Sequence, residues 1–162
     1  MTNKKPIKRN ENIVKLSRDH HASLLFCWKI RQGIKHHIDV DRMVNYVRYF
    51  WTQHFAPHFG EEEAFLFAPL KDDKVQRALD DHKQIKTSIE TMDTFGIQDR
   101  EGKLLQLADM VDEHVRYEER ILFPHLELAL SDEQLTQIGT QISDEPLLDT
   151  YQDAFWKNPS SL

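Results

Sequence analysis

The chain has 162 residues and a formal net charge of −6 at pH 7. This length suits one domain with its own core, and no apolar run approaches the roughly 18 residues of a membrane span. The acidic charge argues against a nucleic-acid partner, because neutralising phosphates requires a clustered basic surface. The single cysteine, Cys27, excludes an internal disulfide framework and any cysteine-rich metal site, and we expect it to be a small buried side chain.

The first ten residues contain the only basic cluster of the sequence. We interpret residues 1–10 as a flexible, solvated basic tail. This segment lacks the apolar core of a secretory signal, so we expect a cytoplasmic location. The basic residues of the tail are Lys4, Lys5, Lys8 and Arg9.

Scarce glycine and proline, with five and six copies, predict helices rather than strands, as do apolar residues that recur at intervals of three and four. Helices with short connections form an antiparallel up-down-up-down four-helix bundle, and we assign residues 11–130 to one such all-α domain. The inward stripes are predicted to include Phe65 and Ile121. The four helices are predicted over about residues 11–32, 39–69, 72–96 and 99–130.

Residues 131–162 follow the predicted bundle. Ser131 and Gln134 have the spacing of a capping box, which predicts a short fifth helix. The rest of this segment carries Tyr151, Phe155 and Trp156. The sequence leaves open whether it lies back on the bundle or binds another molecule.

A histidine four residues ahead of a glutamate occurs twice, in residues 58–62 and 114–118. Positions i and i+4 lie on one face of an α-helix, so each motif can present an imidazole and a carboxylate to one point. An aspartate–histidine pair precedes each motif, at residues 19–20 and 81–82. The candidate metal ligands are therefore His20, His58, Glu62, His82, His114 and Glu118.

All six candidates fall inside the apolar stripes of their helices. A buried carboxylate needs a cation or a hydrogen-bond donor, and few cationic side chains point inward here, so a metal is the simplest partner. Four imidazoles and two carboxylates exceed the needs of one tetrahedral zinc and suit two metals bridged by Glu62 and Glu118. Nitrogen and oxygen ligands with open positions favour non-haem iron, although ligand type alone also leaves manganese and zinc open.

The residues around the six candidates have several interpretations. We treat Asp19 and Asp81 as surface residues or helix caps, because adjacent residues on a helix face different ways. Glu119 is a rival bridging carboxylate, since a carboxylate five residues after His114 can also reach the metal position. For His54 and His125, core packing is preferred over a role as an extra ligand or as an outer partner of a ligand.

The ordered set of motifs resembles the hemerythrin-like family, known for its HHE cation-binding domain. The resemblance covers about residues 11–130 and is most specific in residues 58–67 and 114–124. It implies a centre of two non-haem iron ions with a bridging oxo or hydroxo species, held in an antiparallel bundle. It also implies that the centre binds O2, NO or a related small oxidant such as peroxide.

The chain departs from one part of the family pattern. Oxygen-carrying hemerythrins have a fifth histidine four residues after the ligand of the third helix, and Lys86 occupies that position here. The chain is therefore more similar to the four-histidine members, which include iron sensors and proteins associated with repair of iron–sulfur centres. Lys86 can alternatively approach the metals as a hydrogen-bond donor.

The leading hypothesis is a di-iron protein that binds or senses O2, NO or peroxide. One alternative is an oxidoreductase that reduces NO or peroxide at the same centre. Others are iron storage or delivery, and a helical interaction module whose histidines are structural. The sequence identifies no protein partner.

Overall fold

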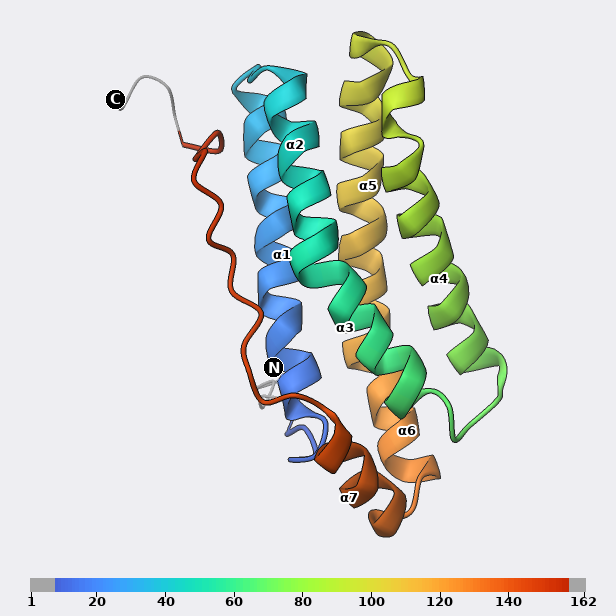
Figure 1. Cartoon of the computed structure of the whole chain (residues 1–162). Helices are drawn as coiled ribbons and strands as arrows, with labels where there is room; N and C mark the ends of the chain where they lie inside the picture. Colours follow the sequence, from blue (N-terminus) through green and yellow to red (C-terminus); the bar gives the residue numbers. More distant parts are fainter. Residues whose placement is uncertain (1–7, 158–162) are drawn as a thin grey trace, which may run out of the picture.

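The computed structural model describes residues 8–157, so most of the predicted basic tail lies outside the described residues. The described part is all-α, as predicted, and contains no strand (Figure 1). None of the helices within it is both long enough and apolar enough to span a bilayer. The elements are α1 Val14–Lys35, α2 Val40–Phe50, η1 Trp51–Phe55, α3 Ala56–Glu61, η2 Glu62–Leu66, α4 Asp73–Glu90, η3 Met92–Thr94, α5 Ile97–Tyr117, η4 Glu118–Leu122, α6 Phe123–Ala129 and α7 Asp132–Gln141.

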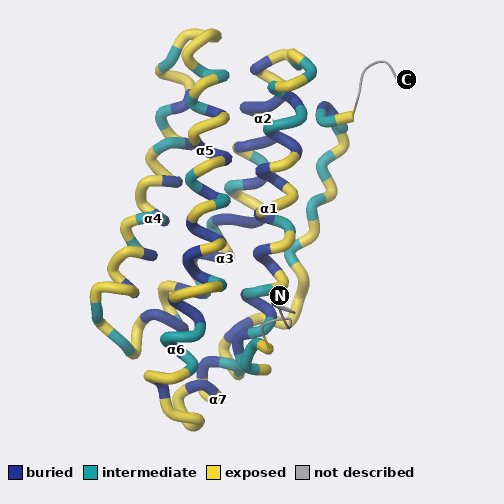
Figure 2. The backbone as a smooth tube through the Cα atoms, turned by 180° about the vertical axis from the view of Figure 1, so that it is seen from behind, coloured by how far each residue is buried: buried dark blue, intermediate teal, exposed yellow. Residues whose placement is uncertain are grey.

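Four antiparallel rods form the predicted bundle (Figure 1). Two rods are α1 and α4, and the other two are continuous runs of several elements, from α2 to η2 and from α5 to α6. Buried residues follow the inner faces of these rods (Figure 2). They form two apolar clusters, one that includes Phe26 and Val111 and one that includes Leu66 and Leu122. On each rod the predicted metal ligands lie where the two clusters meet.

Side-chain caps explain several helix boundaries. Asp39 accepts a hydrogen bond from the backbone N–H of Asp41 at the start of α2, and Asp72 accepts one from Val75 at the start of α4. The predicted fifth helix is α7, and it begins with the capping box that the sequence predicts at Ser131. In Figure 1, α7 lies across the end of the bundle near α6.

The segments η1, η2 and η4 are π-helical turns, each of five residues. A π turn inserts extra residues into the helical repeat and so changes which residues face inward after it. Ile121, predicted to face inward, is 46% exposed, whereas Leu122 and Phe123 are fully buried. Likewise Phe65 is only partly buried and Leu66 is fully buried. The prediction is wrong for Ile121, because it assumed an unbroken α-helical period, whereas Phe65 packs against the second apolar cluster with part of its surface exposed.

The segment after α7 runs back along α1 toward the opposite end of the bundle (Figure 1). Phe155 is buried, and the rings of Phe155, Tyr151 and Trp156 pack around Tyr46. The carboxylate of Asp149 accepts hydrogen bonds from the Tyr46 hydroxyl and from the Lys29 ammonium. The structure thus answers the question that the sequence left open, because this segment lies back on the bundle.

Two glycines should respond in opposite ways to alanine. A Cβ on Gly102, in the second turn of α5, meets nothing within 4 Å, so Gly102→Ala should stabilise the fold by about 0.5–1 kcal/mol through a less flexible unfolded chain. A Cβ on Gly33 would lie 2.6 Å from Met43 Sδ and 3.1 Å from the Phe155 ring. Gly33→Ala should therefore destabilise the fold by about 1–3 kcal/mol. Urea unfolding of the two variants measures the change in the free energy of unfolding for each. Equal changes in the two variants would contradict the close packing at Gly33.

Candidate metal centre

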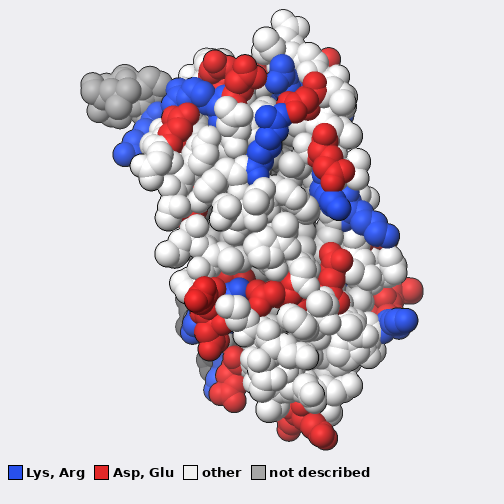
Figure 3. Space-filling view, in the orientation of Figure 1, with Lys and Arg blue, Asp and Glu red and all other residues white. Residues whose placement is uncertain are grey.

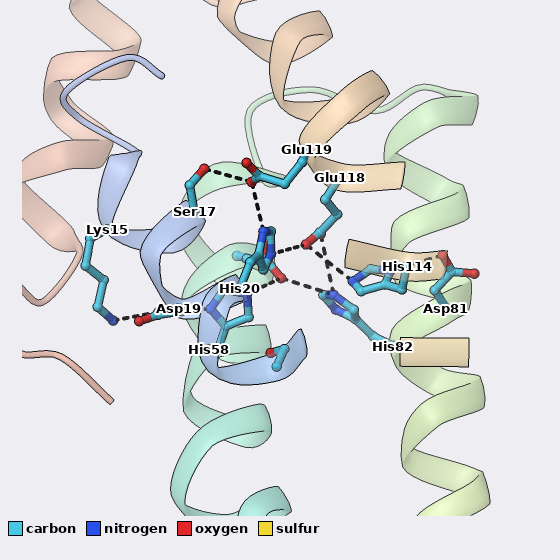
Figure 4. A network of polar contacts seen from close by, with 12 residues as sticks. Lys15, Ser17, Asp19, His20, His58, Asp81, His82, His114, Glu118 and Glu119 are labelled. Carbon is cyan, nitrogen blue, oxygen red and sulfur yellow. Dashed lines mark hydrogen bonds and ion pairs between the residues drawn. The ribbon is translucent and has the colours of Figure 1, made fainter. Parts of the chain in front are cut away.

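The six predicted ligands come from four different rods and meet in the middle of the bundle (Figure 4). All six are buried, and the two glutamates are fully so. Their ligand atoms form two overlapping groups, in each of which the atoms lie within 4.8 Å of one another. The first group is His20, His58, Glu62 and Glu118, and the second is Glu62, His82, His114 and Glu118.

Glu62 faces one histidine of each group. Its Oε1 atom lies 3.3 Å from Nε2 of His58 and 3.2 Å from Nε2 of His82. The glutamate begins the π-helical turn η2, and His58 lies one helical turn before it. A carboxylate placed in this way can bind one ion with each of its neighbours.

Glu118 occupies the matching position on the other motif. Its Oε1 atom lies 2.8 Å from Nε2 of His20 and 3.4 Å from Nε2 of His114. It too begins a π-helical turn, η4. The two groups therefore share both carboxylates, and each group has two imidazoles of its own.

Several buried polar atoms of the cluster have no hydrogen-bond partner, which is unusual in a folded interior. A cation is the partner that they fit, since two ligand atoms about 2.1 Å from an ion and about 90° apart lie about 3.0 Å from each other. The spacings between imidazole and carboxylate given above cluster around that distance. The unpartnered atoms of the cluster are Nε2 of His58, His82 and His114, both carboxylate oxygens of Glu62, and Oε2 of Glu118.

The second nitrogen of each imidazole contacts a carboxylate from another helix. Nδ1 of His58 lies 3.0 Å from Asp19, and Nδ1 of His114 lies 3.0 Å from Asp81 (Figure 4). The interpretation of these aspartates as surface residues or caps is wrong, because Asp19 is buried and Asp81 is only 23% exposed in its side chain. Each aspartate contacts a candidate ligand of another helix, and not the histidine that follows it in sequence.

Two glutamates complete this set. Nδ1 of His82 lies 2.7 Å from Glu63, and Nδ1 of His20 lies 2.8 Å from Glu119. The carboxylate of Glu119 is therefore an outer partner of His20 and not a rival to Glu118. When Nδ1–H donates to a carboxylate, the lone pair of Nε2 is fixed toward the metal position and becomes more basic.

Sequence reasoning missed the role of these four outer carboxylates, although one signal was present. Each of them is the immediate sequence neighbour of a predicted ligand. Adjacent residues differ by about 100° around a helix axis, so in a bundle the neighbour of an inward ligand faces an adjoining helix. The four pairs are Asp19 with His20, Glu62 with Glu63, Asp81 with His82, and Glu118 with Glu119.

The carboxylates decide the charge of the imidazoles. Burial alone would lower the pKa of His20, but Glu118 and Glu119 outweigh it and raise that pKa to about 9. Burial likewise opposes a charge on His58, yet Glu62 and Asp19 raise its pKa to about 9. For Glu118, burial favours the neutral acid, but His114 and the other nearby imidazoles hold its pKa well below the usual range. Protons and metal ions therefore compete for the same atoms.

Other candidates lie outside the two ligand groups. His54 is buried, its Nε2 lies 3.1 Å from the Ser23 hydroxyl, and burial lowers its pKa to about 3. His125 lies nearer the surface, with Nε2 2.6 Å from the carboxylate of Asp72, so it belongs to the helix α4 cap. The Lys86 side chain is 57% exposed, and its ammonium lies 3.8 Å from the carboxylate of Glu90 on the same helix.

Two further expectations concern single residues. Cys27 is buried as predicted, its Sγ lies 3.3 Å from the carbonyl oxygen of Ala108, and burial raises the pKa of its thiol to about 12. The expectation of a solvated tail is wrong for Arg9. Its side chain is 4% exposed and lies 2.6 Å from the carboxylate of Glu127.

These features define a four-helix bundle with a buried histidine and carboxylate metal site. The model of the hemerythrin HHE cation-binding domain matches residues 12–126, and the chain belongs to this family. The matched range contains every residue of the two ligand groups, so the domain is a metal-binding one. No curated protein and no solved structure matches the chain.

Proposed function

We propose that the chain holds two iron ions between its two histidine pairs and binds a small oxidant, O2, NO or peroxide, at that centre. The observation that carries this proposal is the pair of overlapping ligand groups that share Glu62 and Glu118. One ion would take His20 and His58, and the other His82 and His114. Both glutamates would bridge.

The ligand count leaves space for a small molecule. Two imidazoles and two carboxylates give each ion four protein ligands, whereas iron in such sites commonly takes six. When bound, the two ions would supply electrons and open coordination positions to the small oxidant. The protein would contribute fixed imidazoles, two bridging carboxylates and aromatic rings packed against the imidazoles.

Aromatic rings around the imidazoles limit the access of water. The Phe59 ring stacks on His82 with the two ring centroids 3.8 Å apart, and the Phe123 ring stacks on His20 at 5.4 Å. The Phe67 ring also stacks against His82, with the centroids 5.9 Å apart. A site shielded in this way favours a small ligand over a larger substrate.

The charged surface gives no support to a nucleic-acid partner. On the face seen in Figure 3, Lys and Arg side chains lie beside Asp and Glu rather than forming a separate basic surface, for the residues that the structure describes. We therefore propose a partner that is small and that binds at the buried centre. Cytoplasmic location remains a part of this proposal.

Metal analysis with an optical spectrum tests the proposed function. Protein purified from iron-replete cells should contain two iron ions per chain, and its spectrum should change on addition of azide, NO or peroxide. Saturable change without turnover indicates binding or sensing, whereas repeated turnover with a supplied reductant indicates an oxidoreductase. Protein without iron, or iron-loaded protein whose spectrum is unaffected by all three ligands, would contradict the proposal.

A further inference from the structure

The two histidine pairs are equally buried, but they differ in what lies behind them. Behind His58, the Asp19 carboxylate is 3% exposed and lies 3.1 Å from the ammonium of Lys15. Lys15 is itself buried and lies 2.7 Å from Glu61. The outer partner of His58 is thus enclosed and neutralised by a fixed cation.

The outer partner of His20 is held in the same way. Glu119 accepts a hydrogen bond of 2.7 Å from Ser17, and its carboxylate lies 3.5 Å from the guanidinium of Arg9. Arg9 also donates to the backbone carbonyl of Glu119 at 2.9 Å, and it is fixed by Glu127. Through these contacts Asp19 and Glu119, the outer carboxylates behind His58 and His20, are held by residues of α1, of α6 and of the segment before α1.

Among the described residues, the supports of the other pair lack a fixed cation beside them, and Glu63 is the most exposed of the four supports, whereas Glu119, at 28%, and Asp81 are similarly exposed. The side chain of Glu63, behind His82, is 46% exposed, and that of Asp81, behind His114, is 23% exposed. Within residues 8–157, neither carboxylate forms an ion pair with a lysine or an arginine. Each can therefore exchange its imidazole contact for water more readily than Asp19 can.

Cavities reach the same pair. A cavity of about 360 Å³ is lined by His82 and Glu63, with Lys83 and Lys86 among its other residues. A smaller cavity of about 60 Å³ is lined by His114 and Asp81. A third cavity, of about 410 Å³, touches Asp19 but none of the six ligands. Two of these cavities thus bring solvent beside ligands of the second group, and the third brings it beside an outer support of the first.

From this asymmetry we propose that the two metal positions exchange at different rates, and that the ion held by His82 and His114 enters and leaves faster. The inference rests on the proposed two-ion centre. An ion leaves when its imidazoles turn away and water replaces them, so the rate depends on how firmly the outer carboxylates fix the rings. Glu63 and Asp81, which form no ion pair with a lysine or an arginine among the described residues, also attract an incoming cation.

Chelator-driven release tests the proposal. The protein is loaded anaerobically with two equivalents of Fe²⁺ and mixed with an excess of ferrozine. The wild type should release its iron in two phases of equal amplitude. Glu63→Gln and Asp81→Asn should each speed the fast phase by about tenfold and leave the slow phase unchanged. The matched variants Asp19→Asn and Glu119→Gln should speed the slow phase alone, and circular dichroism checks that all four remain helical.

Several outcomes would overturn the inference. Release of both ions in one phase shows that the positions are equivalent. Acceleration of only the slow phase in Glu63→Gln assigns the labile position to the wrong histidine pair. A wild type that binds a single ion contradicts the two-ion function itself, and that result is separate because it is read from the stoichiometry before the chelator is added.

Discussion

Replacing His58 and His114 together by alanine will remove metal binding from both positions while the four rods remain helical. In the proposed two-ion centre each ion would lose one of its two imidazoles, and the shared carboxylates would lose the neighbours that set their position in the cluster. Loss of an outer partner alone commonly reduces metal affinity by about 10–100-fold, so loss of a ligand at each position should exceed that range. Metal analysis after equilibrium dialysis measures the change.

A matched control uses histidines outside the two ligand groups. The double variant His21→Ala and His36→Ala removes the same number of imidazoles and should retain two ions per chain. If the alanine variant at the ligands is too unstable to purify, His58→Gln with His114→Gln keeps the side-chain size, and it should lose metal to the same degree. Retention of two ions in either ligand variant would exclude the assigned ligands.

Removal of metal should lower the melting temperature of the protein by about 10 °C or more. Ligand binding to the folded state alone stabilises it by about 4 kcal/mol when the free ligand is at a thousandfold excess over its Kd. In a chain of this length, 1 kcal/mol corresponds to roughly 2–4 °C in melting temperature. Melting curves of the apo protein and the Co²⁺-loaded protein measure the difference.

The size of this effect should depend on pH. In the apo protein, protonated His20 and His58 can pair with the buried carboxylates, and their pKa values are raised to about 9. The stabilisation that these charged rings contribute is complete below their unfolded pKa of about 6.5 and is lost as the pH rises to about 9. The melting temperature of the apo protein should therefore fall over this range.

The loaded protein should not follow that decline, because the ions replace the protons on the same nitrogen atoms. The stability gained from metal should thus be greater at pH 9 than at pH 6.5. Parallel pH curves for the two forms would mean that the imidazoles do not carry the predicted protons. The difference between the two forms isolates the site, since other titrating groups contribute to both curves.

Local pattern made much of the fold predictable. The spacing of His58 with Glu62 and of His114 with Glu118 depends only on the geometry of one helix, and all four of these candidate ligands lie in the cluster. His20 and His82 needed a further assumption, that the halves of the sequence are alike. The capping box at Ser131 is also a local signal, and the structure confirms it.

The features that could not be predicted depend on distant parts of the chain. The π-helical turns at Glu62 and Glu118 leave no mark in composition, yet they change the inward face and make Ile121 an exposed residue. The choice of Asp19 as partner for His58 requires knowledge of which helices adjoin. Arg9 is held by Glu127, a residue far along the chain, and no spacing rule connects the two.

The outer carboxylates also connect the four rods into a closed circuit. Each rod fixes a ligand of one neighbour and has its own imidazole fixed by another, so the circuit has no free end. A chain threaded through the same four rods in another order could still fold into helices, but the carboxylates would meet the wrong imidazoles. The contacts that fix the imidazoles thus also select one helix order and one relative height of the rods. The circuit runs from His20 to Glu119, from His114 to Asp81, from His82 to Glu63, and from His58 to Asp19.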